Sequence, residues 1–383
     1  MKRDVYVDAR LNTENIGMDE LMHGIFVGQP RCGKTVSAMK YIRELANFRN
    51  SKTGKRCRIV IMDQKQEWGD IEKYVDPERF HIYSPKQSNM NLNPCKIPYG
   101  VEPRQWIKSL ANIYCQAYGL LTKDSEMLSD TFYKLYDATG IFNEKESIPF
   151  GGPNTDSWKK EVSRRSGAVT FHKVYKGMEQ LKSSLNGPNK RAGNDTLDTY
   201  SRLLERLSCF NNPHSIEYRL FSAENDFNDP NSIGTGMGVD ELICEDDITV
   251  FESFGLESTF ANFIFGIITS GFYKVAKGFE KGYLNPSQYE TVLVIEEADK
   301  VMGNDTAGTD GQGGMASLSG QFEFEEILDQ SAGYGLFIIA IAEKISMMPA
   351  NFVANCGFAV CGGASQPEDG DLALHMKKII SIY

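Results

Sequence analysis

The stretch GQPRCGKT, residues 28–35, constrains the fold of this chain more than any other feature of the sequence. It follows a short apolar run, HGIFV (23–27), and leads into residues 35–49, where apolar side chains recur at near-helical spacing. The stretch meets the pattern G-x-x-x-x-G-K-[ST] through Gly28, Gly33, Lys34 and Thr35. Because that pattern lies between a predicted strand and a predicted helix, we predict a phosphate loop and not an ordinary strand-to-helix turn.

Each residue type in this loop has a physical task in phosphate binding. The glycines let backbone N–H groups curl around the β-phosphate, and the helix that follows offers its positive N-terminus. Lys34 neutralises the β and γ oxygens, and the Thr35 hydroxyl is a ligand for Mg²⁺. The sequence therefore predicts ATP and Mg²⁺ as cofactors. We expect the nucleotide to be bound by Gly28, Gln29, Pro30, Arg31, Cys32, Gly33, Lys34, Thr35 and Val36.

A second, acidic element is needed, because a phosphate loop alone neither completes the metal site nor activates water. The run Val292–Ile295 predicts a buried strand, and Glu296 and Glu297 follow it directly. We expect this strand to lie beside the phosphate-loop strand, with Glu296 holding Mg²⁺ and Glu297 acting as the general base. The alternative is that the two glutamates are only the polar end of a strand. Asp63 and Glu67 follow another predicted strand and either assist this site or cap a turn.

Strand and helix patterns alternate over most of the chain, which predicts an α/β fold. We expect a P-loop NTPase of the RecA/ASCE type, with a mostly parallel sheet flanked by helices. Further strands are predicted at 57–63, 79–85, 247–254, 334–343 and 358–363, a long helix at 257–280 and a glycine-rich loop from 303 to 321. Four helices are predicted at 103–121, 125–140, 171–186 and 198–210. We therefore divide the chain into an ATPase domain, 1–100 and 211–383, and a helical insertion, 101–210.

Composition excludes several classes of protein. The net charge of −10 argues against a simple nucleic-acid coat protein. Residues 159–206 nevertheless carry 11 Lys and Arg against 5 Asp and Glu, and form either a solvated helical surface or a surface that faces DNA. Three aromatic residues lie at helical spacing, namely Trp106, Tyr114 and Tyr118. We interpret them as core residues in preference to platforms on which nucleic-acid bases stack. The eight cysteines are scattered, no apolar run is long enough to span a membrane, and the N-terminus lacks signal-peptide features, which predicts a cytoplasmic protein.

Taken in order, these motifs resemble the HerA/FtsK superfamily of P-loop DNA-pumping ATPases, especially HerA and the soluble ATPase domain of conjugative coupling proteins. The resemblance rests on five segments. They are MHGIFVGQPRCGKT (22–35), IVIMDQKQEW (59–68), NLNPCKIP (91–98), VLVIEEAD (292–299) and AGYGLFIIAIAEKISMMPANFVANCGFAV (332–360). By this resemblance Glu343 occupies the sensor position near the γ-phosphate and joins Lys34 and Glu297 as a catalytic residue.

Three positions depart from the family pattern. The acidic strand ends in Glu-Glu where Asp-Glu is usual, and Glu343 follows Ala342 where a Thr/Ser-Gln pair is usual. Ser331 and Ala332 replace basic residues that include an arginine finger in HerA-like motors. The candidate substitutes for this arginine are Arg31, Arg202 and Arg206.

The resemblance implies an ATP-driven DNA translocase, assembled as a ring hexamer, that serves conjugative DNA transfer or mobile-element DNA processing. Its expected partners are DNA, other copies of the chain, and a relaxosome, secretion or nuclease component. Two other functions stay open. One is a viral DNA-packaging ATPase of the same superfamily, and the other is a nucleotide-binding scaffold with little hydrolysis.

Overall fold

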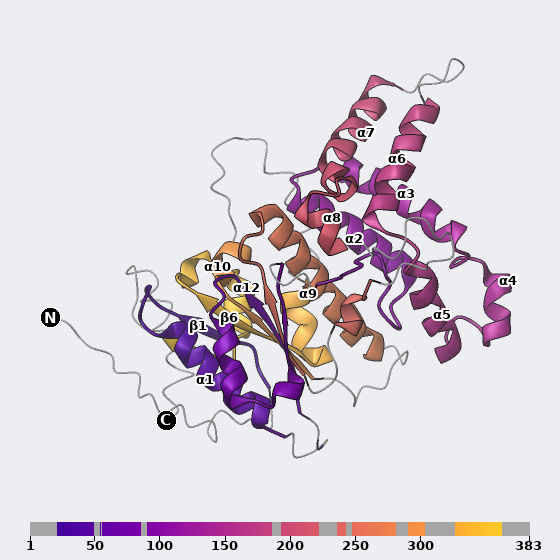
Figure 1. The fold of residues 1–383 in the computed structure, drawn as a ribbon. Helices are drawn as coiled ribbons and strands as arrows, with labels where there is room; N and C mark the ends of the chain where they lie inside the picture. Colours follow the sequence, from indigo (N-terminus) through magenta and orange to yellow (C-terminus); the bar gives the residue numbers. More distant parts are fainter. Residues whose placement is uncertain are drawn as a thin grey trace.

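A seven-stranded sheet forms the centre of the protein (Figure 1), and every strand pair in it is parallel. The computed structural model describes residues 21–49, 54, 56–85, 90–185, 193–221, 236–242, 247–280, 290–302 and 326–361. The strands are β1 (Gly24–Val27), β2 (Arg58–Asp63), β3 (Phe80–Tyr83), β4 (Ile248–Glu252), β5 (Thr291–Ile295), β6 (Leu336–Ala342) and β7 (Phe358–Cys361). They confirm the predicted α/β class and the parallel sheet. The predicted glycine-rich loop from 303 to 321 lies outside the described residues.

The strand order is β3-β4-β2-β5-β6-β1-β7. The prediction that the acidic strand lies beside the phosphate-loop strand is therefore wrong, because β6 pairs with both β1 and β5 and separates them. In the sheet register, Val27 of β1 is opposite Ala342 of β6, and Ile295 of β5 is opposite Met62 of β2. Since all strands point the same way, the residues that follow β1, β2, β5 and β6 meet at one edge of the sheet.

Both faces of the sheet are covered, so its strands are rich in aliphatic residues with no polar face. On one face, α1 (Lys34–Asn47) and the 3₁₀ helix η2 (Trp68–Tyr74) pack against alternate strand residues such as Phe26 and Ile61. On the other face the strand residues between them, such as Ile25 and Val60, join a second and larger core.

The long helix α9 (Ser258–Glu280) belongs to this larger core and joins the sheet to the helices that follow β3. Gly266 of α9 lies so close to α2 (Pro103–Ala117) that a Cβ there would be 2.5 Å from Ile113 Cγ2. The close approach explains glycine at this position, because any side chain would push the two helices apart.

The region between β3 and β4 is mostly helical, as predicted. Besides α2 it contains α3 (Thr122–Ala138), α4 (Glu144–Ser147), α5 (Asp156–Ser166), α6 (Phe171–Leu185), α7 (Asn194–Leu207) and α8 (Ile216–Phe221). In Figure 1, α6 and α7 project away from the sheet, on the side opposite to α1. The predicted core residues Trp106 and Tyr114 are fully buried, and Tyr118 stacks on Tyr114 with ring centroids 4.5 Å apart. The interpretation of these aromatic residues as core is confirmed.

The helical region and the sheet share one hydrophobic core, which runs from the strands through α9 into α2, α3 and α6. Asn93, in the segment after β3, also connects the two parts. Its side-chain amide donates to the carbonyl oxygens of Gly167 (3.1 Å) and Val169 (3.0 Å) between α5 and α6. The division into an ATPase domain and a helical insertion at residues 101–210 stays a prediction.

The remaining short helices connect these elements. They are α10 (Ala298–Val301), α12 (Ala350–Asn355) and the 3₁₀ helices η3 (Pro77–Arg79), η4 (Ile148–Phe150), η5 (Ser208–Asn211), η6 (Val239–Glu241), η8 (Ser331–Tyr334) and η9 (Ile345–Met347). In the part of the chain that the structure describes, no helix combines the length and the apolar character that crossing a bilayer requires.

Candidate nucleotide-binding site

The predicted phosphate loop connects the end of β1 to the start of α1. The Gly28 amide donates to the Ala342 carbonyl of β6 (3.3 Å), and the Cys32 amide closes a tight turn on Gln29 (3.2 Å). Gly33 immediately precedes α1 with φ 87°, a left-handed conformation that side-chain-bearing residues adopt at a cost. A Cβ on Gly33 would meet no atom within 4 Å, so the backbone angle and not space accounts for glycine here.

The N-terminus of α1 is suited to an anion. No side chain among the described residues caps it, and its first turn carries no acidic residue. Neither the cap position nor the first turn of this 14-residue helix therefore offsets its partial positive charge. Lys34 is buried at the helix start, Thr35 is half-buried, and Arg31 is exposed at the tip of the loop. These positions fit the predicted roles of the loop, which stay predictions.

The predicted acidic residues lie at the same sheet edge, directly after β5. Glu296 is 1% exposed and Glu297 is 3% exposed. The Glu296 amide donates to the Met62 carbonyl (3.2 Å), and the Gln64 amide donates to Glu296 Oε2 (3.3 Å). The turn after β2 therefore holds the end of β5, although the two segments are far apart in the sequence.

Asp63, the last residue of β2, organises this turn. Its buried carboxylate accepts three backbone hydrogen bonds, from the amides of Lys65 (2.9 Å), Gln66 (2.8 Å) and Trp68 (3.0 Å). Asp63 therefore caps its turn, which was the second of the two sequence alternatives, and its part in the site stays a prediction. Three amide donors stabilise the negative charge of the Asp63 carboxylate.

The charge on Asp63 affects Glu296. Burial, together with the negative charge of Asp63 and a hydrogen bond to it, raises the pKa of Glu296 to about 8. Among the described residues, no group donates to Glu296 Oε1, which is buried. A buried carboxyl oxygen without a partner, next to a second carboxylate, suits a cation, and oxygen donors are those that Mg²⁺ prefers. Thr35 and Glu296 therefore fit the predicted metal site by their chemistry.

Glu297 has an unusual backbone and a charged partner. It adopts φ 52° and ψ 41°, the left-handed conformation, immediately before α10. Its Oε1 forms an ion pair with Nζ of Lys65, from the turn after β2. Lys65 belongs to the segment IVIMDQKQEW, which carried part of the family resemblance, but its contact with Glu297 was not predicted.

Three non-glycine residues of the described chain have a positive φ, and all three belong to this sheet edge. They are Arg31 (65°) after β1, Gln66 (61°) after β2 and Glu297 (52°) after β5. The Gln66 side chain donates to Glu252 at the end of β4 (2.8 Å), which fixes its turn. Left-handed residues other than glycine persist only where the surrounding structure holds them, and they concentrate at functional sites. The strain therefore marks the same place as the sequence motifs.

Glu343 follows β6, which lies between the strands of the phosphate loop and of the acidic pair. It is half-buried, and its backbone N–H interacts with Asp299 of α10. Burial raises the pKa of Asp299, and the Glu343 N–H partly offsets this shift. The sequence did not single out Asp299, because no motif distinguishes the last acid of VLVIEEAD from a solvent-facing helix residue. The catalytic role of Glu343 stays a prediction.

The arginines considered as substitutes for an arginine finger are placed differently from one another. Arg31 is exposed in the phosphate loop itself. Arg202 of α7 forms an ion pair with the fully buried Asp124 of α3 (2.7 Å) and is thereby part of the helical region's own structure. Ser331, which stands where the family has a basic residue, is fully buried.

Many cations of the basic stretch 159–206 are paired inside the helical region. Arg164 and Arg165 both contact Glu161, at 2.6 and 2.7 Å. Lys176 contacts Glu179 at 3.1 Å. Ion pairs of this kind are typical of a solvated helical surface, the first of the two interpretations of this stretch.

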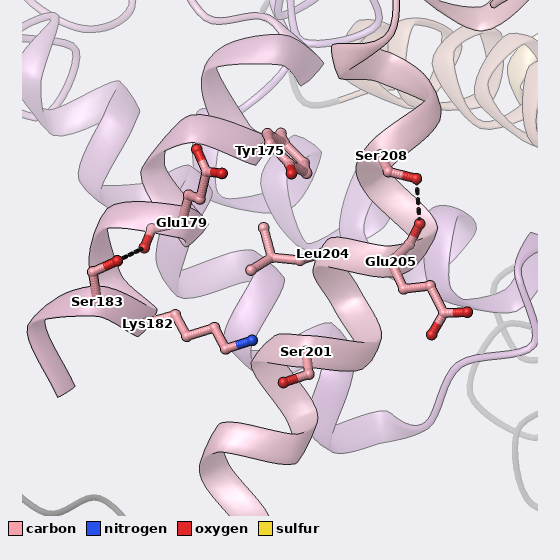
Figure 2. Close-up of a pocket in the computed structure, with 8 residues that line it drawn as sticks. All are labelled: Tyr175, Glu179, Lys182, Ser183, Ser201, Leu204, Glu205 and Ser208. Carbon is pink, nitrogen blue, oxygen red and sulfur yellow. Dashed lines mark hydrogen bonds between the residues drawn. The ribbon is translucent and has the colours of Figure 1, made fainter. Parts of the chain in front are cut away.

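An open hollow of about 640 Å³ lies between α6 and α7, away from the phosphate loop. Figure 2 shows Lys182 of α6 extending toward α7, with Glu179 and Glu205 on either side of the hollow. Its lining of two glutamates and one lysine offers a phosphate group no concentration of positive charge. We therefore assign the nucleotide to the sheet edge and not to this hollow.

The structure was compared with known proteins. VirB4 of Thermoanaerobacter pseudethanolicus matches with a TM-score of 0.56 and 17% identity, over 93% of this chain and 80% of that chain. The bacterial conjugative coupling protein TrwB matches with a TM-score of 0.50 and 13% identity, over 92% of this chain and 71% of that chain. TrwB in complex with the ATP analogue ADPNP matches with a TM-score of 0.51 and 13% identity, over 91% of this chain and 72% of that chain.

This chain has the fold of VirB4 and TrwB. No protein-family model and no curated protein matches the sequence. The predicted resemblance to conjugative coupling ATPases is thus confirmed at the level of the fold, over most of the chain. At these identities the likeness does not carry the activity with it.

Proposed function

We propose that this protein is an ATPase that uses ATP hydrolysis to translocate DNA, in conjugative DNA transfer or a related mobile-element process. The observation that carries the proposal is the sheet edge, where a phosphate loop after β1 and two buried glutamates after β5 flank β6. The fold shared with VirB4 and TrwB supports it, and one TrwB structure holds a non-hydrolysable ATP analogue.

Each residue of the edge has a part in the proposed reaction. The amides of the phosphate loop and the Lys34 ammonium bind the phosphates of ATP. Thr35 and Glu296 would hold Mg²⁺, which when bound neutralises charge on the phosphate oxygens. Glu297 orients and polarises the attacking water as the general base. Glu343, between the two elements, faces the phosphate end of the substrate.

We also propose that the protein works as an oligomer, a ring hexamer in which ATP binds at subunit boundaries. Large apolar side chains are exposed in segments that follow three strands at this edge. Val36 in the first turn of α1 is 70% exposed, Phe254 after β4 is 50% exposed, and Met347 after β6 is 36% exposed. In the proposed ring these three side chains take part in the contact between subunits. A neighbouring subunit would also supply the arginine that Ser331 and Ala332 replace.

DNA and a relaxosome, secretion or nuclease component are the proposed partners. Conjugation is preferred to viral DNA packaging because the matched structures are those of VirB4 and of the conjugative coupling protein TrwB. The proposed site of action is the cytoplasm.

The test is ATP hydrolysis by the purified chain with and without DNA, combined with mass measurement in ATP. We expect hydrolysis that DNA stimulates and an ATP-dependent increase in mass. Lys34→Ala should abolish nucleotide binding and turnover. Lys73→Ala is the matched control, because Lys73 is an exposed lysine whose ion pair with Asp70 lies on the surface. Absence of hydrolysis in both conditions refutes the proposed motor.

One observation favours a second candidate, a nucleotide-binding scaffold that scarcely hydrolyses ATP. The ion pair with Lys65 engages Oε1 of the Glu297 carboxylate, the proposed general base. Tight ATP binding with turnover close to zero, unchanged by DNA and by oligomerisation, would establish this alternative.

A further inference from the structure

Lys65 lies in the turn after β2 and extends its side chain to the acidic edge. Its backbone is fixed from two sides. The Lys65 amide donates to Asp63 Oδ1 (2.9 Å), and the neighbouring Gln66 is tied to Glu252 (2.8 Å). The base of the side chain is thus held by strands β2 and β4, while its ammonium group reaches Glu297 after β5. The backbone position of Lys65 is therefore fixed by hydrogen bonds of the fold, unlike that of a lysine in a mobile surface loop.

The two partners differ in their exposure. The Glu297 side chain is 3% exposed and that of Lys65 is 39% exposed. The lysine therefore covers a buried carboxylate from the solvent side. Buried carboxylates are stable only with a partner, and removing one member of such a pair leaves an uncompensated charge.

The surroundings of Lys65 are acidic. Burial acts to lower the pKa of Lys65, but the hydrogen bond and charge of Glu297, with the charges of Glu296 and Glu67, outweigh it and raise the pKa overall. The ammonium group therefore stays charged over the whole range in which enzymes of this kind are assayed. It contacts the residue to which we assign the general base, and not the residue assigned to the metal.

A general base is effective only when its carboxylate is held in reach of the water, with its orientation fixed by neighbouring groups. Glu297 has a left-handed backbone, which by itself leaves several side-chain rotamers open. We propose that Lys65 is a positioning residue for hydrolysis, which fixes the Glu297 carboxylate in the orientation from which it polarises water. This inference rests on the proposed function and adds to it a residue that acts through Glu297.

The test is steady-state ATP hydrolysis by Lys65→Met, Lys65→Arg, Glu297→Gln and the double variant Lys65→Met with Glu297→Gln. Loss of a group that orients a catalytic residue typically reduces activity by about 10–100-fold. We expect Lys65→Met to lower kcat by that factor while KM for ATP changes by less than about threefold, because binding does not involve the pair. Lys65→Arg should restore most of kcat, since it keeps the charge.

The double variant separates a role through Glu297 from a general structural role. If Lys65 acts only through Glu297, adding Lys65→Met to Glu297→Gln lowers turnover no further. Lys73→Met is the control, because it removes a lysine whose ion pair with Asp70 is exposed on both sides. If Lys65→Met does not fold, as judged by circular dichroism and nucleotide binding, Lys65→Gln takes its place in the series.

Three results overturn the inference while the proposed function stands. The first is that Lys65→Met has the same kcat as an active wild type. The second is that Lys65→Arg has as low a kcat as Lys65→Met. The third is that adding Lys65→Met to Glu297→Gln lowers kcat by the same factor as Lys65→Met alone does in the wild type. A wild-type protein without ATP hydrolysis refutes the proposed function and with it the role of Lys65, so the two failures are distinguishable.

Discussion

Glu296→Gln should make the nucleotide-free protein more stable, although it removes a residue that the proposed reaction needs. Glutamine resembles the protonated form of Glu296 and keeps an oxygen that can accept from the Gln64 amide. Burial and the charge of Asp63 raise the pKa of Glu296 from 4.5 to about 8. Ionised Glu296 is therefore unfavourable in the folded protein, and the substitution relieves this cost.

The pH dependence follows from the direction of the shift. Below pH 4.5 the carboxyl is protonated in the folded and the unfolded chain, so the substitution has little effect. Between pH 4.5 and about 8 the unfolded chain releases the proton and the folded chain keeps it, so wild-type stability falls as the pH rises. Above pH 8 the full difference between the variant and the wild type is present.

The magnitude follows from the same shift. One pKa unit is worth about 1.4 kcal/mol, so the whole shift sets an upper limit of about 5 kcal/mol. Relaxation around the ionised pair reduces this cost, and we expect about 2–5 kcal/mol at pH 8.5. For a chain of 383 residues that unfolds as one unit, this corresponds to a rise in Tm of about 3–6 °C.

The assay is thermal unfolding without nucleotide from pH 4.5 to 9, with Glu72→Gln as a control that makes the same change at an exposed position. Added ATP and Mg²⁺ should raise the Tm of the wild type more than that of Glu296→Gln, since the ligand stabilises in proportion to its affinity. A Glu296→Gln variant with the wild-type Tm at pH 8.5, or a difference that does not grow with pH, refutes the reasoning.

Three further predictions concern the site and the core. Glu297→Gln should lower kcat for ATP by about 100-fold or more and keep ATP affinity, as measured by steady-state kinetics and a fluorescent nucleotide. Gly33→Val should weaken ATP binding in the same titration, because φ 87° costs a residue with a side chain about 1–2 kcal/mol and the relaxed loop moves its amides. Trp106→Ala should lower the free energy of unfolding in urea by about 3–5 kcal/mol, since the side chain is fully buried and its Nε1 donates to Pro94 (3.0 Å).

Each of these has a result that contradicts it. Unchanged turnover in Glu297→Gln would show that another group activates the water. Wild-type ATP affinity in Gly33→Val would show that the left-handed turn is not needed for binding. A loss below about 1 kcal/mol in Trp106→Ala would mean that the helical region and the sheet do not share a tightly packed core.

The sequence predicted the strands and most helices because their signals are local. Continuous apolar runs correspond to most of β5 and to β6, and the four predicted helices of the helical region are present as α2, α3, α6 and α7. It missed the short helices α4 and α8 and also α5, whose sequence DSWKKEVSRRS offers only Trp158 and Val162 as apolar residues. That helix is held by its Thr155 cap and by contacts that no periodicity reveals. The order of strands was predicted less well, because β6 enters between β1 and β5 from far along the chain.

The sequence predicted the motifs of the site, but it did not predict which residues of these motifs contact one another. The phosphate loop has a fixed spacing, and the pair Glu296 and Glu297 follows an obvious strand. The Lys65 ion pair joins residues more than two hundred positions apart in the sequence, and the Asp299 contact joins its carboxyl to the backbone of Glu343 after another strand. No local pattern encodes such a distance, so only the folded structure reveals these partners.

The helical region bears on where DNA would be bound. Its excess of basic residues is a sequence property, yet Arg164, Arg165 and Lys176 contact glutamates and Arg202 contacts a buried aspartate. A cation that already has a carboxylate partner gains less from a phosphate, because the existing pair must be broken first. The number of basic residues in this stretch therefore overstates its affinity for DNA. We therefore expect the proposed motor to bind DNA in a pore between several subunits, where weak DNA contacts from each subunit add up.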